Sequence, residues 1–295
     1  MIKQYLLLLL VACLSFGTST AQTSDSLIVN RLRAEGVKFS HNNTVTLLMN
    51  GQEKFDDMFR AIRQARSSVH LEYFNFRNDS IANMLFDLLA EKAKEGVEVR
   101  ALFDAFGNSS NNRPLKKKHL KSIRERGIEI YEFSPLRFPW INQVFHRDHR
   151  KIVVVDGNVA YTGGVNLADE YINAEQRFGY WKDAAIRLEG AAVWNFTVMF
   201  LNAWNAFRPQ ETDYTAFAPT RLPAVQDGVV QPYADSPLDE EPLAETVYLD
   251  ILSQAQRYVY IYTPYLAVGE EMLDALKNAA KRGVDVRLIL PGIPD

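Results

Sequence analysis

The sequence has 295 residues, of which 47% are hydrophobic and 23% are charged, a composition typical of a globular protein with one large or two ordinary domains. The 36 acidic residues outnumber the 33 basic ones, so there is no overall positive charge to favour nucleic acid as a partner. The only cysteine is Cys13, which excludes a disulfide framework or a cysteine-rich zinc site within these residues.

Residues 1–21 have the features of a secretory signal peptide. Lys3 precedes a 12-residue apolar run over Tyr5–Phe16, which is shorter than the roughly 20 residues that cross a bilayer as a helix. A small-x-small cleavage site, STA, follows at 19–21. We therefore expect an exported protein, periplasmic or associated with the cell envelope. An uncleaved N-terminal anchor and a lipoprotein processed at Cys13 are the alternatives.

Helices and strands alternate after residue 50. Apolar residues at helical spacing predict helices over Phe55–Ala65, Ser80–Lys94, Leu115–Arg126 and Ala191–Phe207. Apolar runs bounded by turn residues predict strands over Val69–Phe76, Val97–Asp104, Ile128–Phe133, His149–Asp156, Val159–Thr162 and Ala184–Leu188. This alternation predicts an α/β fold with a largely parallel sheet covered by helices.

The composition changes after Phe207. Six of the 12 prolines lie within the 34 residues 209–242, a density that neither a helix nor a central strand tolerates. Tyr214, Phe217 and Tyr233 offer packing surface in this stretch. We therefore interpret it as an ordered connector.

The sequence after the connector repeats the sequence before it. Residues 255–266 (AQRYVYIYTPYL) match residues 65–76 (ARSSVHLEYFNF), and residues 278–290 match residues 91–103 around a shared K-x-G-V-x-V-R core. Such self-similarity predicts two similar α/β lobes. The expected organisation is a lead-in over 22–50, a first lobe over 51–208, the connector over 209–242 and the start of an incomplete second lobe over 243–295.

Residues 145–171 carry the candidate chemistry. His149 and Lys151 are two positions apart, so on a strand their side chains share a face. Asp156 opens a D-G-N sequence typical of a tight turn, and the returning strand ends in G-G-V-N at 163–166, where glycine lets a ligand approach the backbone. An imidazole, an ammonium group and the amide of Asn166 would together suit an anionic tetrahedral group such as phosphate.

This pattern resembles the HxKxxxxD motif of the phospholipase D superfamily, with its trailing Gly-x-x-Asn at 163–166. Further segments resemble bacterial cardiolipin synthases: LEYFNF, EKAKEGVEVRALFDAFG, DGNVAYTGGVNLADEY, YWKDAAIRLEG and TPYL. The resemblance implies an αβα sandwich of two pseudo-repeat lobes, each bringing one motif to a shared site, with the second lobe truncated here. Gly164 departs from the pattern, since many members have serine there.

The resemblance also implies roles for individual residues. His149 would attack phosphorus and form a phosphohistidine, while Lys151 and Asn166 would bind the non-bridging oxygens. Asp156 belongs to the motif but lies at the far end of the strand, so we expect it to act in orientation or structure. Asp183 is the candidate acceptor for the second nitrogen of His149.

Glu72, on an early strand, and Gly164 complete the candidate phosphate-binding or orienting residues. The covalent route needs no metal or other cofactor. A metal site at His146, Asp148 and His149 is the alternative, although no further ligand-type residues accompany them in the sequence.

The function implied by the resemblance is that of a cardiolipin synthase-type phosphatidyltransferase. Its partners would be a phosphatidylglycerol-like phospholipid and a membrane surface, with no nucleic acid. A secreted phospholipase D, a superfamily nuclease and a non-catalytic binding half are the alternatives. The second lobe should supply a second catalytic histidine, and none of the five histidines has the corresponding repeat position. We therefore expect a partial sequence.

Overall fold

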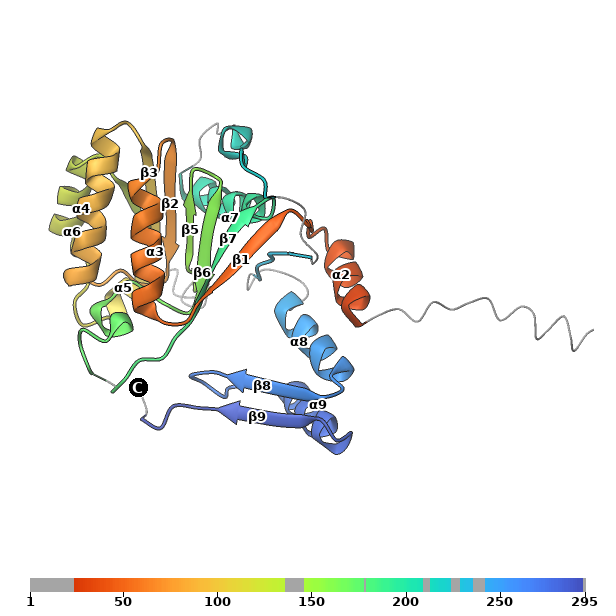
Figure 1. Cartoon of the computed structure of the whole chain (residues 1–295). Helices are drawn as coiled ribbons and strands as arrows, with labels where there is room; N and C mark the ends of the chain where they lie inside the picture. Colours follow the sequence, from red (N-terminus) through yellow and green to blue (C-terminus); the bar gives the residue numbers. More distant parts are fainter. Residues whose placement is uncertain are drawn as a thin grey trace, which may run out of the picture. The chain divides into compact units, whose positions relative to one another are not determined.

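The computed structural model describes residues 24–135, 146–177, 179–208, 213–223, 229–235 and 242–293. The predicted signal peptide lies outside the described residues. Two compact units can be distinguished (Figure 1): a larger one over 38–244, 263–265 and 290–293, and a smaller one over 24–37, 245–262 and 266–289. No helix in the described ranges has both the length and the apolar character needed to span a bilayer.

A seven-stranded sheet forms the centre of the larger unit, in the order β1-β7-β6-β5-β2-β3-β4. The strands are β1 (Asn43–Leu48), β2 (Ser68–Tyr73), β3 (Glu98–Asp104), β4 (Glu129–Phe133), β5 (Ile152–Val155), β6 (Val159–Gly163) and β7 (Ala185–Gly190). Only β2, β3 and β4 pair in parallel, while the other four pairings are antiparallel. The prediction of a largely parallel sheet is therefore wrong. Parallel pairing needs a crossover connection, whereas β5 and β6 are joined by a tight turn.

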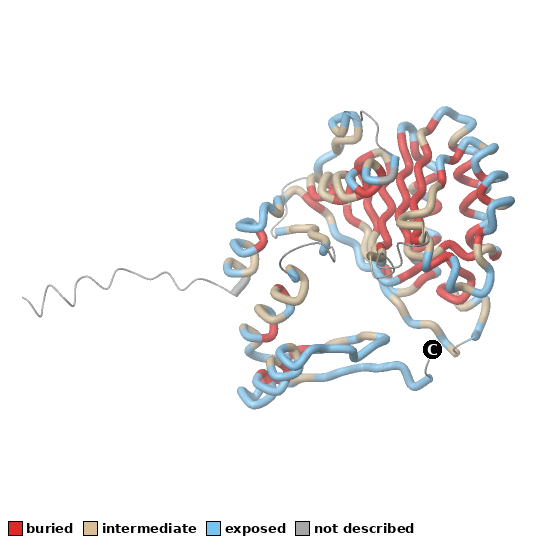
Figure 2. Tube along the Cα trace, turned by 180° about the vertical axis from the view of Figure 1, so that it is seen from behind, coloured by how far each residue is buried: buried red, intermediate tan, exposed pale blue. Residues whose placement is uncertain are grey.

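Helices cover both faces of this sheet, which gives the predicted αβα sandwich (Figure 1). On one face lie α3 (Gly51–Arg63), α4 (Ser80–Lys94) and α6 (Lys117–Glu125), and on the other lies α7 (Val193–Phe207). The short α5 (Ala105–Ser110) follows directly at the end of β3. Side chains alternate accordingly along β5. Val153 and Val155 belong to the core beneath α3 and α4, whereas Ile152 and Val154 pack with α7. The central strands β2, β3 and β5 are the most continuously buried part of the unit (Figure 2).

Most of the predicted elements are present with shifted ends. The helix predicted over Ser80–Lys94 has those bounds, and Asp79 caps it by accepting a hydrogen bond from the amide of Ala82. Of the strand predicted over His149–Asp156, only the apolar centre Ile152–Val155 forms β5, so His149 and Lys151 precede it. The sequence analysis missed β1, α5 and α2 (Ser24–Ala34).

The described parts of the proline-rich connector pack against the larger unit. Tyr214 and Phe217, which form a short 3-10 helix, lie against the apolar cluster around Trp204. Val230 forms an isolated antiparallel bridge with Ser40. For these residues, the structure confirms an ordered connector; residues 209–212, 224–228 and 236–241 lie outside the described ranges.

The smaller unit contains the structural repeat that the sequence predicts. It holds α2, α8 (Leu243–Gln254), β8 (Tyr258–Tyr262), α9 (Glu270–Lys281) and β9 (Asp285–Ile289). Strands β8 and β9 pair in parallel with Tyr258 opposite Asp285, while β2 and β3 pair with Ser68 opposite Glu98. Each strand pair therefore has the same register at the repeat positions. The exact domain boundaries proposed above stay predictions.

Asp156 anchors the end of the sheet that lies farthest from His149. Its carboxylate accepts hydrogen bonds from the backbone amides of Arg66, Ser67 and Ser68 at 2.8–3.1 Å, and from the Ser67 hydroxyl at 2.9 Å. Partial burial acts to raise the pKa of Asp156, but these hydrogen bonds outweigh it and lower the pKa below its usual value. Asp156 thus ties the β5–β6 turn to the start of β2.

We predict that Asp156→Ala lowers the free energy of unfolding by about 2 kcal/mol at pH 7, because several amides lose a charged acceptor. Asp156→Asn should cost less, since asparagine tolerates the positive φ of 53° at this position. As the folded-state pKa is lowered, the wild-type advantage is present at neutral pH and disappears as the pH falls through that pKa. Urea unfolding at pH 7 and pH 3 measures these differences. Equal stability of wild type and Asp156→Ala at pH 7 would contradict the role.

Candidate active site

His149 and Lys151 lie close together at the end of the sheet where β5 begins and β6 ends. The Lys151 Nζ lies 3.1 Å from His149 Nδ1 and donates to the His149 carbonyl oxygen at 2.6 Å. The two side chains therefore lie on one side of the chain, as their spacing predicts. The His149 ring packs on Phe74, with 4.6 Å between ring centroids, and Phe74 also lies 5.4 Å from the Lys151 ammonium.

The two groups differ in burial and in charge. His149 is exposed, and desolvation together with the Lys151 charge lowers its pKa from the ordinary 6.5, so the imidazole is neutral at pH 7. Lys151 is only 6% exposed, and burial lowers its pKa to about 8, opposed by Asp148 and Asp183. At pH 7 the site therefore combines a neutral imidazole with a side chain that is still largely an ammonium.

Asn166 lies three residues after the end of β6. It is buried, and its Nδ2 donates to the Tyr171 hydroxyl at 3.0 Å. Its Oδ1 is buried without a hydrogen-bond partner among the described residues. Burial raises the pKa of Tyr171 to about 12, so Tyr171 is a neutral phenol that can both accept and donate a hydrogen bond.

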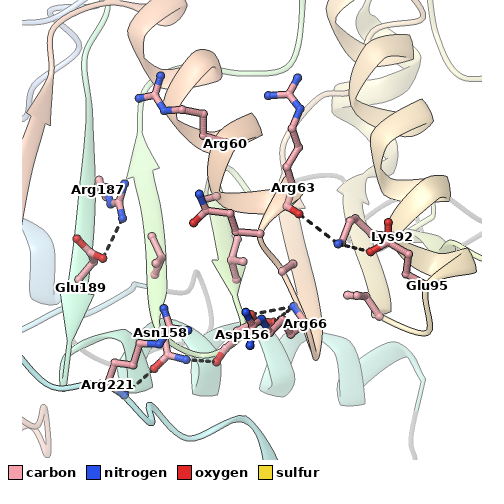
Figure 3. A pocket seen from close by; sticks show the side chains of 16 residues that line it. Arg60, Arg63, Arg66, Lys92, Glu95, Asp156, Asn158, Arg187, Glu189 and Arg221 are labelled. Atoms are coloured by element: carbon pink, nitrogen blue, oxygen red, sulfur yellow. Dashed lines mark hydrogen bonds and ion pairs between the residues drawn. The ribbon is translucent and has the colours of Figure 1, made fainter.

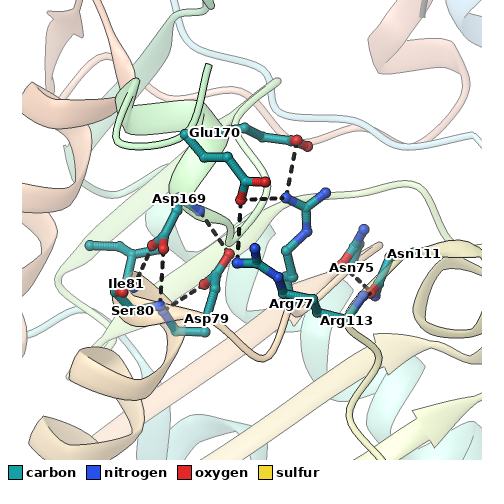
Figure 4. Close-up of polar contacts among 11 residues, drawn as sticks. Asn75, Arg77, Asp79, Ser80, Ile81, Asn111, Arg113, Asp169 and Glu170 are labelled. Atoms are coloured by element: carbon teal, nitrogen blue, oxygen red, sulfur yellow. Dashed lines mark hydrogen bonds and ion pairs between the residues drawn. The ribbon is translucent and has the colours of Figure 1, made fainter. Parts of the chain in front are cut away.

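A polar cluster holds the segment that follows Asn166 (Figure 4). The Asp169 carboxylate accepts from the amides of Ser80 and Ile81, and the Asp169 amide donates to Asp79. Beside it, buried Arg77 forms an ion pair with Glu170 at 3.1 Å. These contacts fix the loop after β6 to the start of α4, and so restrict where Asn166 and Tyr171 can lie.

The position of Asp183 explains the glycine at 164. A Cβ atom at Gly164 would lie 2.4 Å from the Asp183 Oδ1, so a larger residue would displace this carboxylate. Asp183 accepts from the Ala184 amide at 2.8 Å and from the Trp181 indole at 3.4 Å. Its negative charge acts to raise the pKa of Lys151 and that of Lys54. Within the described ranges no contact joins Asp183 to His149, so the structure does not bring together the pair that the resemblance suggested.

Lys54, on α3, was missed by the sequence analysis. It is 3% exposed, donates to the Tyr73 hydroxyl, and lies 4.1 Å from the Phe55 ring centroid. Burial lowers its pKa to about 7, with Asp183 opposing the shift. A lysine in an amphipathic helix is usually solvated, so the sequence carries no signal for this burial.

Glu72 does not share the face of Lys151. In the sheet it lies opposite Ile152, whose side chain packs toward α7. Arg150 bridges Glu72, at 2.8 Å, and Asp148, at 3.0 Å. Burial raises the pKa of Glu72 well above its ordinary value, and Asp148 adds to the shift. Glu72 and Asp156 therefore lie away from the pair formed by His149 and Lys151, whereas Gly164, Asn166 and Asp183 lie at the same end of β5 and β6.

The alternative metal site at His146, Asp148 and His149 falls on described residues. Across the described ranges, no three His, Cys, Asp or Glu side chains are grouped closely enough to hold a metal ion. Asp148 is instead engaged by Arg150 through both its backbone amide and its guanidinium group.

Comparison with known proteins identifies sequence relatives over nearly the whole chain. The family described as "Cardiolipin synthase, PLD-like domain" matches residues 58–178 and 248–295. An uncharacterized protein of Streptococcus mutans is 45% identical over 268 residues, covering 89% of this chain and 56% of that protein. A cardiolipin synthase of Staphylococcus aureus is 36% identical over 258 residues, covering 86% of this chain and 51% of the enzyme. The chain thus spans about half the length of the curated relatives it matches.

The fold is also similar to that of a solved enzyme. The crystal structure of a phosphatidylserine synthase from Haemophilus influenzae superposes with a TM-score of 0.64, at 14% sequence identity. The match covers 89% of this chain and 66% of that structure. At this identity the likeness establishes the fold.

We predict that Asp183→Asn lowers the pKa of both Lys151 and Lys54, because each ammonium loses a neighbouring negative charge. Asp148→Asn is the matched control, since Asp148 acts on Lys151 and is not among the groups that shift Lys54. NMR titration of ¹³C-labelled lysine side chains resolves the two groups. Unchanged lysine pKa values in Asp183→Asn would contradict the claim that the Asp183 carboxylate acts on both lysines.

We predict that buried Lys54 makes stability rise with pH. Its pKa is about 7 in the folded chain and near the ordinary 10.5 when unfolded, so the unfolded state binds more protons between these values. Within that window the free energy of unfolding should increase by about 1.4 kcal/mol per pH unit. Denaturant unfolding at pH 7.5 and 9.5 should show this increase in wild type and in the exposed control Lys121→Met. In Lys54→Met the increase should be smaller by about 1.4 kcal/mol per pH unit, with the contribution of Lys151, whose pKa is also lowered, remaining; an unchanged slope there would contradict the assignment.

Proposed function

Because the chain belongs to the cardiolipin synthase family of phospholipase D-like domains, we propose that the protein is a phosphatidyltransferase of cardiolipin synthase type. The observation that carries the proposal is the 3.1 Å contact between Lys151 Nζ and His149 Nδ1. It combines an exposed neutral imidazole, which can act as a nucleophile, with a buried ammonium group, which can bind a phosphodiester oxygen.

The contact between the two side chains implies an order of events. A lysine ammonium can only donate, so Lys151 keeps Nδ1 of His149 as an acceptor and leaves the ring proton on Nε2. The two contacts of Lys151 use two of its three N–H groups, so a bound phosphodiester can accept from the third and draw the ammonium away from Nδ1. When Lys151 turns to a non-bridging oxygen, Nδ1 is free to take up the ring proton, and the lone pair then lies on Nε2. His149 is then ready to attack.

The first chemical step is then a displacement at phosphorus. The Nε2–P bond forms, the bond from phosphorus to the headgroup oxygen breaks, and that oxygen leaves as an alcohol after taking a proton from a general acid, the role expected of the second histidine. In the second step, the hydroxyl oxygen of an acceptor attacks the phosphohistidine. Its proton passes to the same group, now a base, and the imidazole of His149 is regenerated. With a second phosphatidylglycerol as acceptor the products are cardiolipin and glycerol.

Asn166 can supply a second donor to the phosphate. Rotating its carboxamide by 180° would place Oδ1 against Tyr171, whose hydroxyl can donate to it. The Nδ2 would then occupy the position that Oδ1 holds, where the buried oxygen now has no hydrogen-bond partner among the described residues. This exchange would satisfy both polar atoms when a phosphate oxygen is present, which supports the predicted role of Asn166.

Hydrolysis is the second candidate function, since water can replace the alcohol in the second step without any change in the first. The predicted export segment at residues 1–21 favours it, whereas the similarity to named cardiolipin synthases favours transfer. The products distinguish them: transfer yields cardiolipin and hydrolysis yields phosphatidic acid. We further propose that the enzyme acts at a membrane surface, where such substrates occur, and is exported.

We predict that His149→Ala reduces turnover of phosphatidylglycerol vesicles by at least about a thousandfold, because the covalent route is lost. His119→Ala is the matched control and should keep wild-type turnover, because its ring lies on α6 and interacts with the Lys116 amide. Mass spectrometry of cardiolipin and phosphatidic acid measures both products, and trapping of a phosphatidyl group on the protein should succeed only when His149 is present.

The rate of the wild-type enzyme should also fall in two pH ranges. Protonation of His149 reduces it below pH 6.5, and loss of the Lys151 proton reduces it near pH 8. Near wild-type turnover of His149→Ala would refute the nucleophile. Inactivation by EDTA with recovery on adding zinc would favour a metal-dependent reaction instead.

A further inference from the structure

A pocket lies at the end of β5 opposite to His149. It has a volume of about 840 Å³ and is bordered by the last turn of α3, the end of α4, the β5–β6 turn, β7 and the connector. Figure 3 shows the charged residues that line it, together with the uncharged amide of Asn158. The site proposed at His149 uses none of these side chains.

Positive charge exceeds negative charge around this pocket. Five arginines and one lysine line it, against the three carboxylates of Glu95, Asp156 and Glu189. Asp57 lies nearby and pairs with Arg60 at 2.8 Å and with Arg187 at 3.1 Å. With Asp57 included, six cationic groups face four carboxylates, which leaves a net charge of +2.

The excess is concentrated on three guanidinium groups. Lys92 is neutralised by Glu95, and Arg187 pairs with Glu189 at 2.8 Å. The Asp156 carboxylate is occupied by the amides at 66–68 and the Ser67 hydroxyl. Within the part of the chain that the structure describes, no carboxylate pairs with the side chains of Arg63, Arg66 or Arg221.

These arginines come from three different segments whose backbones are held in place. Arg63 belongs to the last turn of α3, and its carbonyl oxygen accepts from Lys92. The amide of Arg66 donates to Asp156, and the amide of Arg221 donates to Asn158 at 2.8 Å. Basic residues at a helix C-terminus favour the helix dipole, which accounts for Arg63. It does not account for Arg66 and Arg221, which lie outside helices.

We propose that this pocket binds a phosphate group carrying about two negative charges, either on a lipid headgroup or on a soluble phosphate compound. A guanidinium group donates two parallel hydrogen bonds that match phosphate oxygens. Three such groups from separate segments line the pocket and give it the excess positive charge that an anion would neutralise. The volume of the pocket is within the usual range for small-molecule sites. As the three side chains are exposed, binding should weaken with salt.

The test is isothermal titration calorimetry of the full chain with pyrophosphate, at 20 mM and at 300 mM salt. In parallel, the chain is sedimented with phosphatidylcholine vesicles with or without phosphatidic acid. The variant Arg63→Gln/Arg66→Gln/Arg221→Gln should bind at least tenfold more weakly. The control Lys117→Gln/Lys118→Gln/Lys121→Gln removes three exposed charges on α6 and should bind like wild type.

Each outcome has a distinct meaning. Pyrophosphate binding that is lost in the arginine variant supports a soluble ligand, and loss only of phosphatidic acid-dependent sedimentation supports a lipid headgroup. Equal binding by wild type and the arginine variant, equal weakening in the lysine control, or no binding of either probe at low salt would overturn the proposal. If the triple variant does not fold by circular dichroism, Arg66→Gln and Arg221→Gln are measured singly, with about threefold losses expected. His149→Ala should bind normally, so this result is independent of the proposed function.

Discussion

The alternation of side chains along residues 149–155 is the constraint on which the rest of the site depends. Because β5 is central in a sheet covered on both faces, its four apolar residues must pack in opposite directions. A shift of one residue would turn every side chain to the other face. This register directs Lys151 toward the side of α3, while Arg150 lies on the side of Glu72. The chemistry at the start of β5 is therefore positioned by the packing of the apolar residues that follow it.

Buried charges on the two sides of β5 are balanced in different ways. On one side, the single carboxylate of Asp183 acts on two lysines with lowered pKa values. On the other side, the single guanidinium of Arg150 lies between the two carboxylates of Glu72 and Asp148. The first arrangement leaves an ammonium group whose charge is only partly compensated, which suits binding an anion. In the second, the raised pKa of Glu72 favours its neutral acid, which leaves Arg150 and Asp148 as a balanced ion pair and suits a structural role.

The two ends of the same hairpin also differ. At the His149 end, a buried ammonium adjoins an exposed imidazole. At the Asp156 end, the carboxylate accepts hydrogen bonds from backbone amides, and the surrounding basic residues outnumber the carboxylates. The HxKxxxxD spacing thus spans the length of one strand and connects two separate polar regions of the larger unit. The last residue of the motif contributes to the first region only by holding the strand that carries the other two.

The sequence by itself determined the family, the repeat and the proximity of His149 to Lys151, because these depend on spacing along the chain and on local backbone geometry. The helix over Ser80–Lys94 with its Asp79 cap is equally local. Only the tertiary structure decided the mixed sheet, the burial of Lys54 and the separation of Glu72 from the site. It also decided the contact of Asp183 with Gly164 and the gathering of Arg63, Arg66 and Arg221. Each of these depends on which distant segments pack together, and on the resulting loss of water around a charged group, which the order of residues does not encode locally.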